Sequence, residues 1–268
     1  MKKKMRKNGL ILIVALLSVF GLSSCIQGDN VSEGQAFGVL EFNDNYTPVL
    51  YSSYGPFYSP SINTLLDDYK MNIGGCYIFT YRLDADLPEN SQNVVNANGY
   101  YTVSIIDYHE IDRYPMDSYL TDTSTVMPNE IAVSSVYDNS YYLEGFLFMY
   151  QSVTQPSDLE LNWNMSFDYN TMMPTVENGV RYFDVFVRAT KKNEGTKSTV
   201  NMQYLNAYSM GSYLQSAANS EKSILGSSYN ELSSTFAVRF NYASTIDAET
   251  QKITWRSHSI AIPIALFL

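Results

Sequence analysis

Eleven consecutive residues, Leu159–Tyr169, alternate strictly between apolar and polar side chains. In the stretch LELNWNMSFDY every odd position is apolar, including Trp163 and Phe167, and every even position is polar. Because successive side chains of a β-strand point to opposite faces, this period predicts a strand with one face on a core and the other in water. Arg181–Ala189 repeats the pattern, so the second half of the chain should form a sheet with one buried face.

Strand patterns dominate the rest of the chain as well. The 23 tyrosines and 13 phenylalanines favour strands, and only residues 207–223 read as a helix of any length. Four or five strands between residues 36 and 111 predict a small barrel, which closes its own edges. The later strands predict an antiparallel β-sandwich, and Pro263 indicates that the last strand lies on an edge. The predicted fold class is all-β.

The N-terminus predicts an export signal. Five basic residues among the first seven precede an apolar run, Leu10–Phe20. This run is shorter than the roughly 20 residues that a membrane-spanning helix needs, but it fits the apolar region of a signal peptide. The stretch Leu22-Ser23-Ser24-Cys25 resembles the bacterial lipobox. This resemblance implies cleavage before Cys25 and acylation of that cysteine.

Charge limits the partners of the exported chain. Residues 1–24 hold five of the 17 Lys and Arg residues and none of the 27 acidic residues, so the remainder has a net charge near −15. Nucleic-acid binding rewards basic patches, so we expect no nucleic-acid partner. If Cys25 is acylated, Cys76 is the only other cysteine, and its apolar strand predicts a small buried residue rather than a reactive thiol.

Three stretches resemble the NigD-like lipoproteins of Bacteroidetes. They are the lipobox, GYYTVSIIDYHEI at residues 99–111 and RFNYASTIDAETQKITW at residues 239–255. The resemblance implies an OB-like N-terminal barrel followed by a C-terminal β-sandwich. The family has no settled activity. Its name derives from genes beside a bacteriocin cluster, which points to an immunity or accessory role.

Together these observations predict the organisation and location of the protein. We expect a signal peptide at 1–24, a flexible tether at 25–34, an OB-like β-barrel at 35–114, a linker at 115–130 and a β-sandwich at 131–268. The anchor should hold the protein at the outer membrane. Surface-exported members often carry an acidic cluster after the cysteine, and here only Asp29 and Glu33 are available, so the choice between the periplasmic face and the cell surface stays open.

Catalytic and metal-binding patterns are sparse. His109 lies among Asp107, Glu110 and Asp112, but a strand that runs into a polar loop explains this stretch without a metal. His258 fits an ordinary strand residue, and the oxygen-rich residues Glu41–Tyr46 fit a hairpin turn better than a calcium loop. No phosphate loop or hydrolase motif is present in the sequence. We therefore expect no catalytic residues, no metal and no cofactor.

Aromatic residues in turns are the best binding candidates. Tyr54, Phe57 and Tyr58 lie in a stretch rich in proline and glycine, and Tyr141 and Tyr142 follow a second turn. Exposed aromatic groups often mark recognition sites. We therefore expect a non-enzymatic, lipid-anchored envelope protein that binds a glycan, a peptide or a partner protein. A structural subunit or a bacteriocin-immunity accessory is the alternative, and a β-sandwich hydrolase is less favoured.

Overall fold

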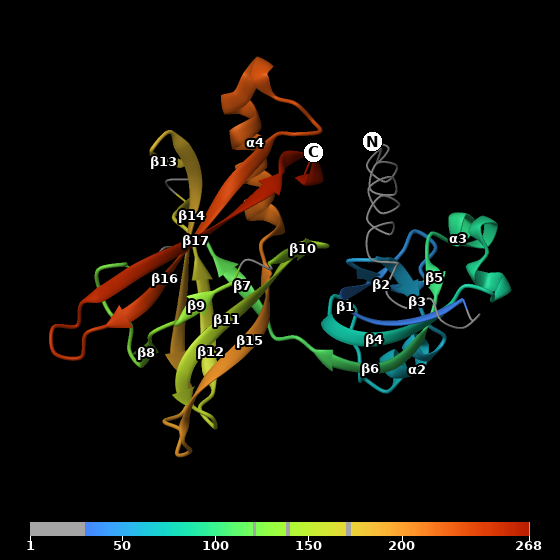
Figure 1. Ribbon diagram of the computed structural model, residues 1–268, viewed down its shortest axis with the longest axis horizontal. Coiled ribbons are helices and arrows are strands. Elements are labelled where there is room, and N and C mark those ends of the chain that lie inside the picture. Colours follow the sequence, from blue (N-terminus) through green and yellow to red (C-terminus); the bar gives the residue numbers. More distant parts are fainter. Residues whose placement is uncertain (1–29, 120–121, 138–139, 170–172, 268) are drawn as a thin grey trace. The chain divides into compact units, whose positions relative to one another are not determined.

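The computed structural model describes residues 30–119, 122–137, 140–169 and 173–267 (Figure 1). The chain forms two compact units that divide between Ile111 and Asp112. Each unit is built around a β-sheet and has its own apolar core. The all-β fold class is therefore confirmed. Among the described residues, no helix has the length and apolar character needed to cross a membrane.

The sheet of unit 1 closes on itself. Its strands are β1 (Val31–Phe42), β2 (Pro48–Ser52), β3 (Gly55–Tyr58), β4 (Cys76–Asp84), β5 (Tyr101–Thr102) and β6 (Ser104–Glu110), in the spatial order β5-β3-β2-β1-β4-β6. Only Val103 separates β5 from β6. The two therefore act as one bent strand that pairs with β3 through β5 and with β4 through β6. The result is a nearly closed, OB-like barrel.

Side chains fill this barrel and helices attach to it. Leu40, Leu50, Phe57 and Phe79 form its centre, all at most 2% exposed. The helices are α2 (Ser61–Asp67), η1 (Pro88–Asn90) and α3 (Gln92–Asn98). Helix α2 adds Ile62 to the core. Cys76 is fully buried at the start of β4, as its apolar context predicted.

Unit 2 contains a larger sheet. Its strands are β7 (Arg113–Asp117), β8 (Glu130–Ile131), β9 (Ser135–Val136), β10 (Tyr141–Leu143), β11 (Phe146–Pro156), β12 (Leu161–Ser166), β13 (Thr175–Glu177), β14 (Val180–Lys191), β15 (Thr199–Ser209), β16 (Thr235–Ile246) and β17 (Ile253–Pro263). Its helices are α4 (Gly211–Leu225), η3 (Gly226–Ser228) and η4 (Ile264–Phe267). The main path runs β10-β11-β15-β7-β12-β14-β16-β17. Strand β17 ends this path, as Pro263 predicted.

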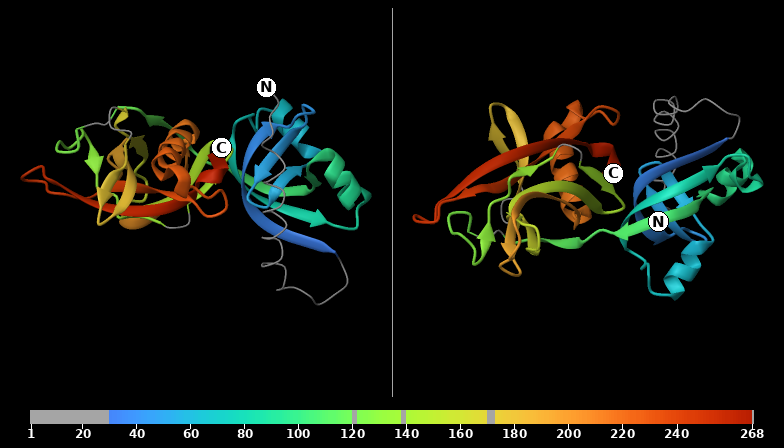
Figure 2. Two further views of the ribbon diagram at one scale, coloured as in Figure 1. Left: turned by 90° about the horizontal axis from the view of Figure 1, so that it is seen from above. Right: turned by 60° about the horizontal axis from the view of Figure 1, so that its bottom comes forward.

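The alternating stretch behaves as its period predicts. In β12, Leu161, Trp163 and Met165 are at most 5% exposed and face the core of unit 2. Helix α4 lies over the sheet of unit 2 (Figure 2), and its Leu214 and Ala217 belong to the same core. The predicted helix at 207–223 thus begins later, at Gly211, because residues up to Ser209 continue β15.

The two ends of the segment 115–130, predicted as a linker, belong to the sheet of unit 2, as the end of β7 and the start of β8. Strand β7 lies within residues 113–117 and pairs in parallel with β15 on one side and β12 on the other. It joins the two halves of the sheet, and with the β14–β16 pair it adds parallel pairing to a sheet predicted to be antiparallel. Its residues RYPMD carry a proline and charges, so the sequence lacks the alternation that marks a strand.

The loop of unit 2 that contains Asp158 gives a prediction for pH dependence. The Asp158 carboxylate accepts hydrogen bonds from the backbone N–H groups of Lys197 and Thr196, each at 2.9 Å, and from the Thr196 hydroxyl at 2.8 Å. These bonds, that of Lys197 first, lower the pKa of Asp158 to about 2. The pKa of Asp158 in the folded state lies below its ordinary value. The ionised carboxylate therefore stabilises the fold at a pH above the ordinary pKa, and this contribution disappears as the pH falls through the lower, folded-state pKa.

Asp158→Asn should therefore be less stable than the wild type at neutral pH, and the difference should vanish as the pH approaches 2. Urea unfolding of both proteins across this range measures the effect. Glu160→Gln, at a neighbouring exposed position, is the control and should show no such convergence. A pH-independent difference between Asp158→Asn and wild type would contradict the prediction.

Candidate functional site

Three strand ends meet at one edge of unit 2. Because β7 runs parallel to both β12 and β15, the carboxyl ends of all three strands lie together. The register places Met116 beside Met165 and Pro115 beside Ser209. Helix α4 starts two residues after β15, so its first turns lie at the same edge.

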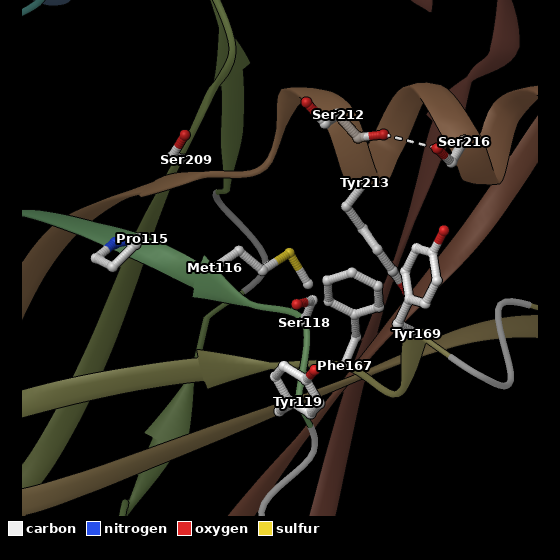
Figure 3. Close-up of a pocket in the computed structure, with 10 residues that line it drawn as sticks. All are labelled: Pro115, Met116, Ser118, Tyr119, Phe167, Tyr169, Ser209, Ser212, Tyr213 and Ser216. Atoms are coloured by element: carbon white, nitrogen blue, oxygen red, sulfur yellow. Dashed lines mark hydrogen bonds between the residues drawn. The ribbon is translucent and has the colours of Figure 1, made fainter.

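A cavity of about 640 Å³ opens at this edge (Figure 3). Its lining comes from the end of β7, the end of β12, the end of β15 and the first turns of α4. The lining residues are Pro115, Met116, Ser118, Tyr119, Phe167, Tyr169, Ser209, Ser212, Tyr213 and Ser216. This volume lies within the range of small-molecule sites, roughly 300–1,000 Å³.

Four aromatic rings shape the cavity. Phe167 and Tyr213 form its inner part, with ring centroids 4.7 Å apart and planes inclined by 56°. The Tyr213 hydroxyl donates to the backbone carbonyl of Asp184 at 3.3 Å, which fixes the ring. Tyr119 and Tyr169 are 85% and 67% exposed and lie nearer to solvent. The cavity thus has a fixed inner pair and an open outer pair of rings.

Hydroxyl groups accompany the rings. Ser212 and Ser216 are one turn apart on α4, and the Ser216 hydroxyl donates to the Ser212 carbonyl at 2.9 Å (Figure 3). Backbone bonds hold the two facing segments together, since Phe167 N–H donates to the Asp117 carbonyl at 3.0 Å and Tyr169 N–H to the Ser118 carbonyl at 3.4 Å.

Among the residues that the structure describes, the lining carries no ionised group. None of its ten residues has an acidic or basic side chain. Burial raises the pKa of Tyr213 well above its ordinary value, so its hydroxyl keeps its proton at physiological pH. A site of neutral hydroxyls and aromatic faces suits a neutral ligand that combines C–H surfaces with hydroxyl groups.

The residues predicted for binding lie elsewhere. Tyr54, Phe57 and Tyr58 belong to unit 1, and part of the stretch predicted as a loop is a strand. Residues Gly55–Tyr58 form β3, whose alternation turns Phe57 into the barrel core at 2% exposure. Tyr54 is 42% exposed, and Tyr58 is half-buried with its ring 5.1 Å from that of Tyr100.

Tyr141 and Tyr142 lie on β10 in unit 2, outside the cavity lining. Tyr141 is 37% exposed, whereas Tyr142 is half-buried and packs against Phe267 at a centroid distance of 4.8 Å. Cys25 lies outside the described residues. The five aromatic candidates are thus divided between the two units, and none of them lines the cavity.

The stretch around His109 forms no metal cluster in the described part of the chain. His109 Nε2 lies 3.3 Å from Asp107 Oδ2 on an exposed strand face. No group of three or more His, Cys, Asp or Glu side chains gathers anywhere among the residues that the structure places.

The sequence missed the aromatic residues of the cavity for different reasons. The alternation predicts Phe167 and Tyr169 on the apolar face of one continuous strand, whereas β12 ends at Ser166. Tyr119 fell in the supposed linker. Tyr213 looked like one face of a helix. The usable signal in the sequence is the period-2 alternation, which continues beyond the end of β12 as far as Tyr169. In the structure the Tyr169 residue is 67% exposed.

Comparison with known proteins concerns unit 1 first. Residues 28–109 match the family model of the lipoprotein OB domain. The match covers nearly all of the described part of unit 1 and confirms the resemblance to lipoproteins with an OB-like N-terminal domain. A lipoprotein domain agrees with a membrane-anchored protein of the cell envelope. No curated protein matches the chain.

Solved structures match across both units. An uncharacterized protein from Parabacteroides merdae is 20% identical, with a TM-score of 0.72 over 86% of this chain and 99% of that one. A protein of unknown function from Bacteroides vulgatus is 13% identical, with a TM-score of 0.50 over 87% and 92%. A NigD-like immunity protein from Bacteroides caccae is 9% identical, with a TM-score of 0.43 over 88% and 99%. The first two of these likenesses establish the fold and not the activity.

Proposed function

We propose that this protein is a lipid-anchored, non-enzymatic protein of the outer membrane that binds a neutral glycan in the cavity of unit 2. The lipobox-like stretch that ends at Cys25 and the lipoprotein OB domain support the anchored location. Stable anchoring takes two or more acyl chains, which the chemistry of a lipobox supplies. The anchored chain would present unit 2 to soluble or surface glycans.

The composition of the cavity carries the proposal for the ligand. Four aromatic rings and four serine hydroxyls line it, without a charged side chain. The C–H faces of a sugar ring pack on aromatic rings, and its hydroxyl groups exchange hydrogen bonds with serine. A charged ligand would leave its charge without a partner in this site, which is costly when water is displaced.

Binding should depend on the outer rings. Tyr119→Ala and Tyr169→Ala should each weaken binding of a neutral oligosaccharide about two- to twelvefold, because a well-placed aromatic contact contributes about 0.5–1.5 kcal/mol. Full-length protein in lipid nanodiscs is first screened on an array of neutral and acidic glycans. The affinity for the strongest neutral glycan is then measured for each variant.

Tyr54→Ala is the matched control, because Tyr54 is a partly exposed tyrosine of unit 1. It should bind as the wild type does. Two results count against the proposal: no neutral glycan is retained by the wild type, or Tyr119→Ala and Tyr169→Ala bind as tightly as Tyr54→Ala.

A further inference from the structure

Two further cavities of unit 2 adjoin along one segment of the chain. One, of about 250 Å³, is lined by the ends of β11 and β14, and the other, of about 580 Å³, by residues 126–132 and the turn between β16 and β17. Figures 1 and 2 show β8 and this turn on the same side of unit 2. Ile131, Ala132 and Lys191 line both cavities. We call the two cavities together the β8 groove, because β8 ends at Ile131.

The main chain at the centre of the groove offers hydrogen-bonding groups. The N–H of Lys191 donates to the carbonyl of Asn129 at 2.9 Å, so the bonds between β8 and β14 leave from every second residue of β8. Glu130 lies between the bonded residues and therefore turns its carbonyl away from β14. Among the described residues, neither the N–H nor the carbonyl of Ala132 has a hydrogen-bond partner. This segment is a short strand edge with which another extended chain can pair.

A buried acceptor belongs to the lining of the smaller cavity. Gln155 lines this cavity and is 3% exposed. Its Nε2 donates to the Leu159 carbonyl at 2.9 Å and to the Tyr204 hydroxyl at 2.5 Å. Because the Leu159 carbonyl can only accept, the orientation of the amide is fixed, and Gln155 Oε1 is buried without a partner among the described residues. An unpaired buried acceptor is unfavourable, so this cavity favours a ligand that carries an N–H group.

One positive charge lies where the two cavities meet. Lys191 is the only basic residue that the structure describes in either lining. Its side chain is 31% exposed and pairs at 2.9 Å with that of Glu194, which is 80% exposed. An ion pair this exposed is weak, so the ammonium group can exchange it for a carboxylate of a ligand. The other acidic residue of the linings, Glu130, is already paired with Arg188.

Apolar side chains complete the groove on both sides of Lys191. They include Val126, Met127, Pro128 and Ile246 in the larger cavity and Pro156 and Leu159 in the smaller one. A ligand that lies across the groove therefore meets apolar surface at both ends and a positive charge at its middle. An extended peptide has this form when apolar residues flank a single acidic residue.

We propose that the β8 groove binds an extended apolar peptide with one central acidic residue. The main chain of the peptide pairs with the free groups of Glu130 and Ala132, as in other cases in which a peptide adds a strand to the edge of a sheet. Its carboxylate pairs with Lys191, and one of its N–H groups supplies the donor that Gln155 Oε1 lacks. Its apolar side chains occupy the two cavities.

The test uses three peptides and the full-length protein in phosphatidylcholine nanodiscs, with empty nanodiscs subtracted. The first peptide is fluorescein-Gly-Gly-Val-Leu-Glu-Leu-Val with an amidated C-terminus. The second has glutamine in place of glutamate, and the third carries N-methyl groups on both leucines. In fluorescence anisotropy the first should bind saturably and the second about fivefold more weakly, because it lacks the ion pair. The third should bind about tenfold more weakly, because it loses main-chain hydrogen bonds.

Variants of the protein locate the binding. Lys191→Met should weaken binding of the glutamate peptide about fivefold and leave binding of the glutamine peptide unchanged, because only the glutamate peptide loses an ion pair. Lys192→Met is the matched control, since it removes the same charge from an exposed neighbouring position outside both linings. It should bind both peptides as the wild type does. Urea unfolding of both variants checks that the fold is intact.

Three results would overturn the proposal. They are the absence of saturable binding of the glutamate peptide, an equal effect of Lys191→Met on the glutamate and glutamine peptides, and equal binding of the N-methylated peptide, which would assign the groove to an apolar ligand without main-chain pairing. Among the described residues, the β8 groove shares no lining residue with the cavity proposed for glycans. Tyr119→Ala should therefore leave peptide binding unchanged, and the two proposals can fail separately.

Discussion

Arg188→Met is expected to lower the free energy of unfolding by about 3–5 kcal/mol, because it leaves a buried carboxylate without its partner. Arg188 is 1% exposed, and the Glu130 side chain is fully buried. The guanidinium donates through Nε to Glu130 Oε1 at 2.6 Å and through Nη2 to Glu130 Oε2 at 2.5 Å. It also donates to the backbone carbonyls of Asp122 and Thr125, so methionine would remove four hydrogen bonds in all.

The effect should extend to the loop before β8. The Arg188 guanidinium lies 5.7 Å from the ring centre of Trp255, whose Nε1–H donates to the Thr123 carbonyl at 3.1 Å. Without Arg188 the loop at residues 122–130 loses the side-chain hydrogen bonds that join Asp122, Thr125 and Glu130 to β14. Amide hydrogen exchange in this loop should therefore rise together with the loss of stability in urea.

Two further variants isolate the cause. Lys191 lies on the same strand as Arg188 and forms a partly exposed ion pair with Glu194. Lys191→Met removes this pair and should lower the free energy of unfolding by at most about 1 kcal/mol. Arg188→Met combined with Glu130→Met removes both charges and should recover much of the loss. The explanation fails if the single Arg188 variant loses less stability than Lys191→Met, or if the double variant is no better than the single one.

Part of the fold could be predicted from local patterns in the sequence. Period-2 alternation placed Trp163 and Met165 in the core, since burial on one face leaves a direct trace in the order of residues. Pro263 marked an edge because it cannot donate a hydrogen bond to a further strand. Neither inference needed knowledge of a distant segment.

Parallel pairing and the cavity leave no such trace. Strand β7 is short and polar, and it becomes a strand only because β12 and β15 lie on either side of it. The cavity gathers residues from Pro115 to Ser216, so no local pattern could bring them together. At Phe57 a local pattern was misleading. The neighbouring glycine and proline indicated a loop, whereas Phe57 lies in β3 and its ring is buried in the barrel core.

Cys25→Ala is expected to move the protein from the membrane fraction to the soluble fraction. The acyl chains that the lipobox implies would supply the whole membrane affinity of the mature protein, because each buried CH₂ group contributes about 0.8 kcal/mol and two or more chains give a durable anchor. The acidic chain offers no basic patch to replace them. Fractionation of cells, followed by mass measurement of the purified protein, tests both the location and the modification.

Cys76→Ala is the matched control for this prediction, because Cys76 is the other cysteine of the chain and is fully buried in unit 1. It should remain in the membrane fraction and keep the mass of the acylated form, even if the small loss of packing lowers its stability. Membrane retention of Cys25→Ala at the wild-type level, or an unmodified thiol at Cys25 in the wild type, would exclude the lipid anchor. The cavity would then have to act in a protein held in place by other contacts.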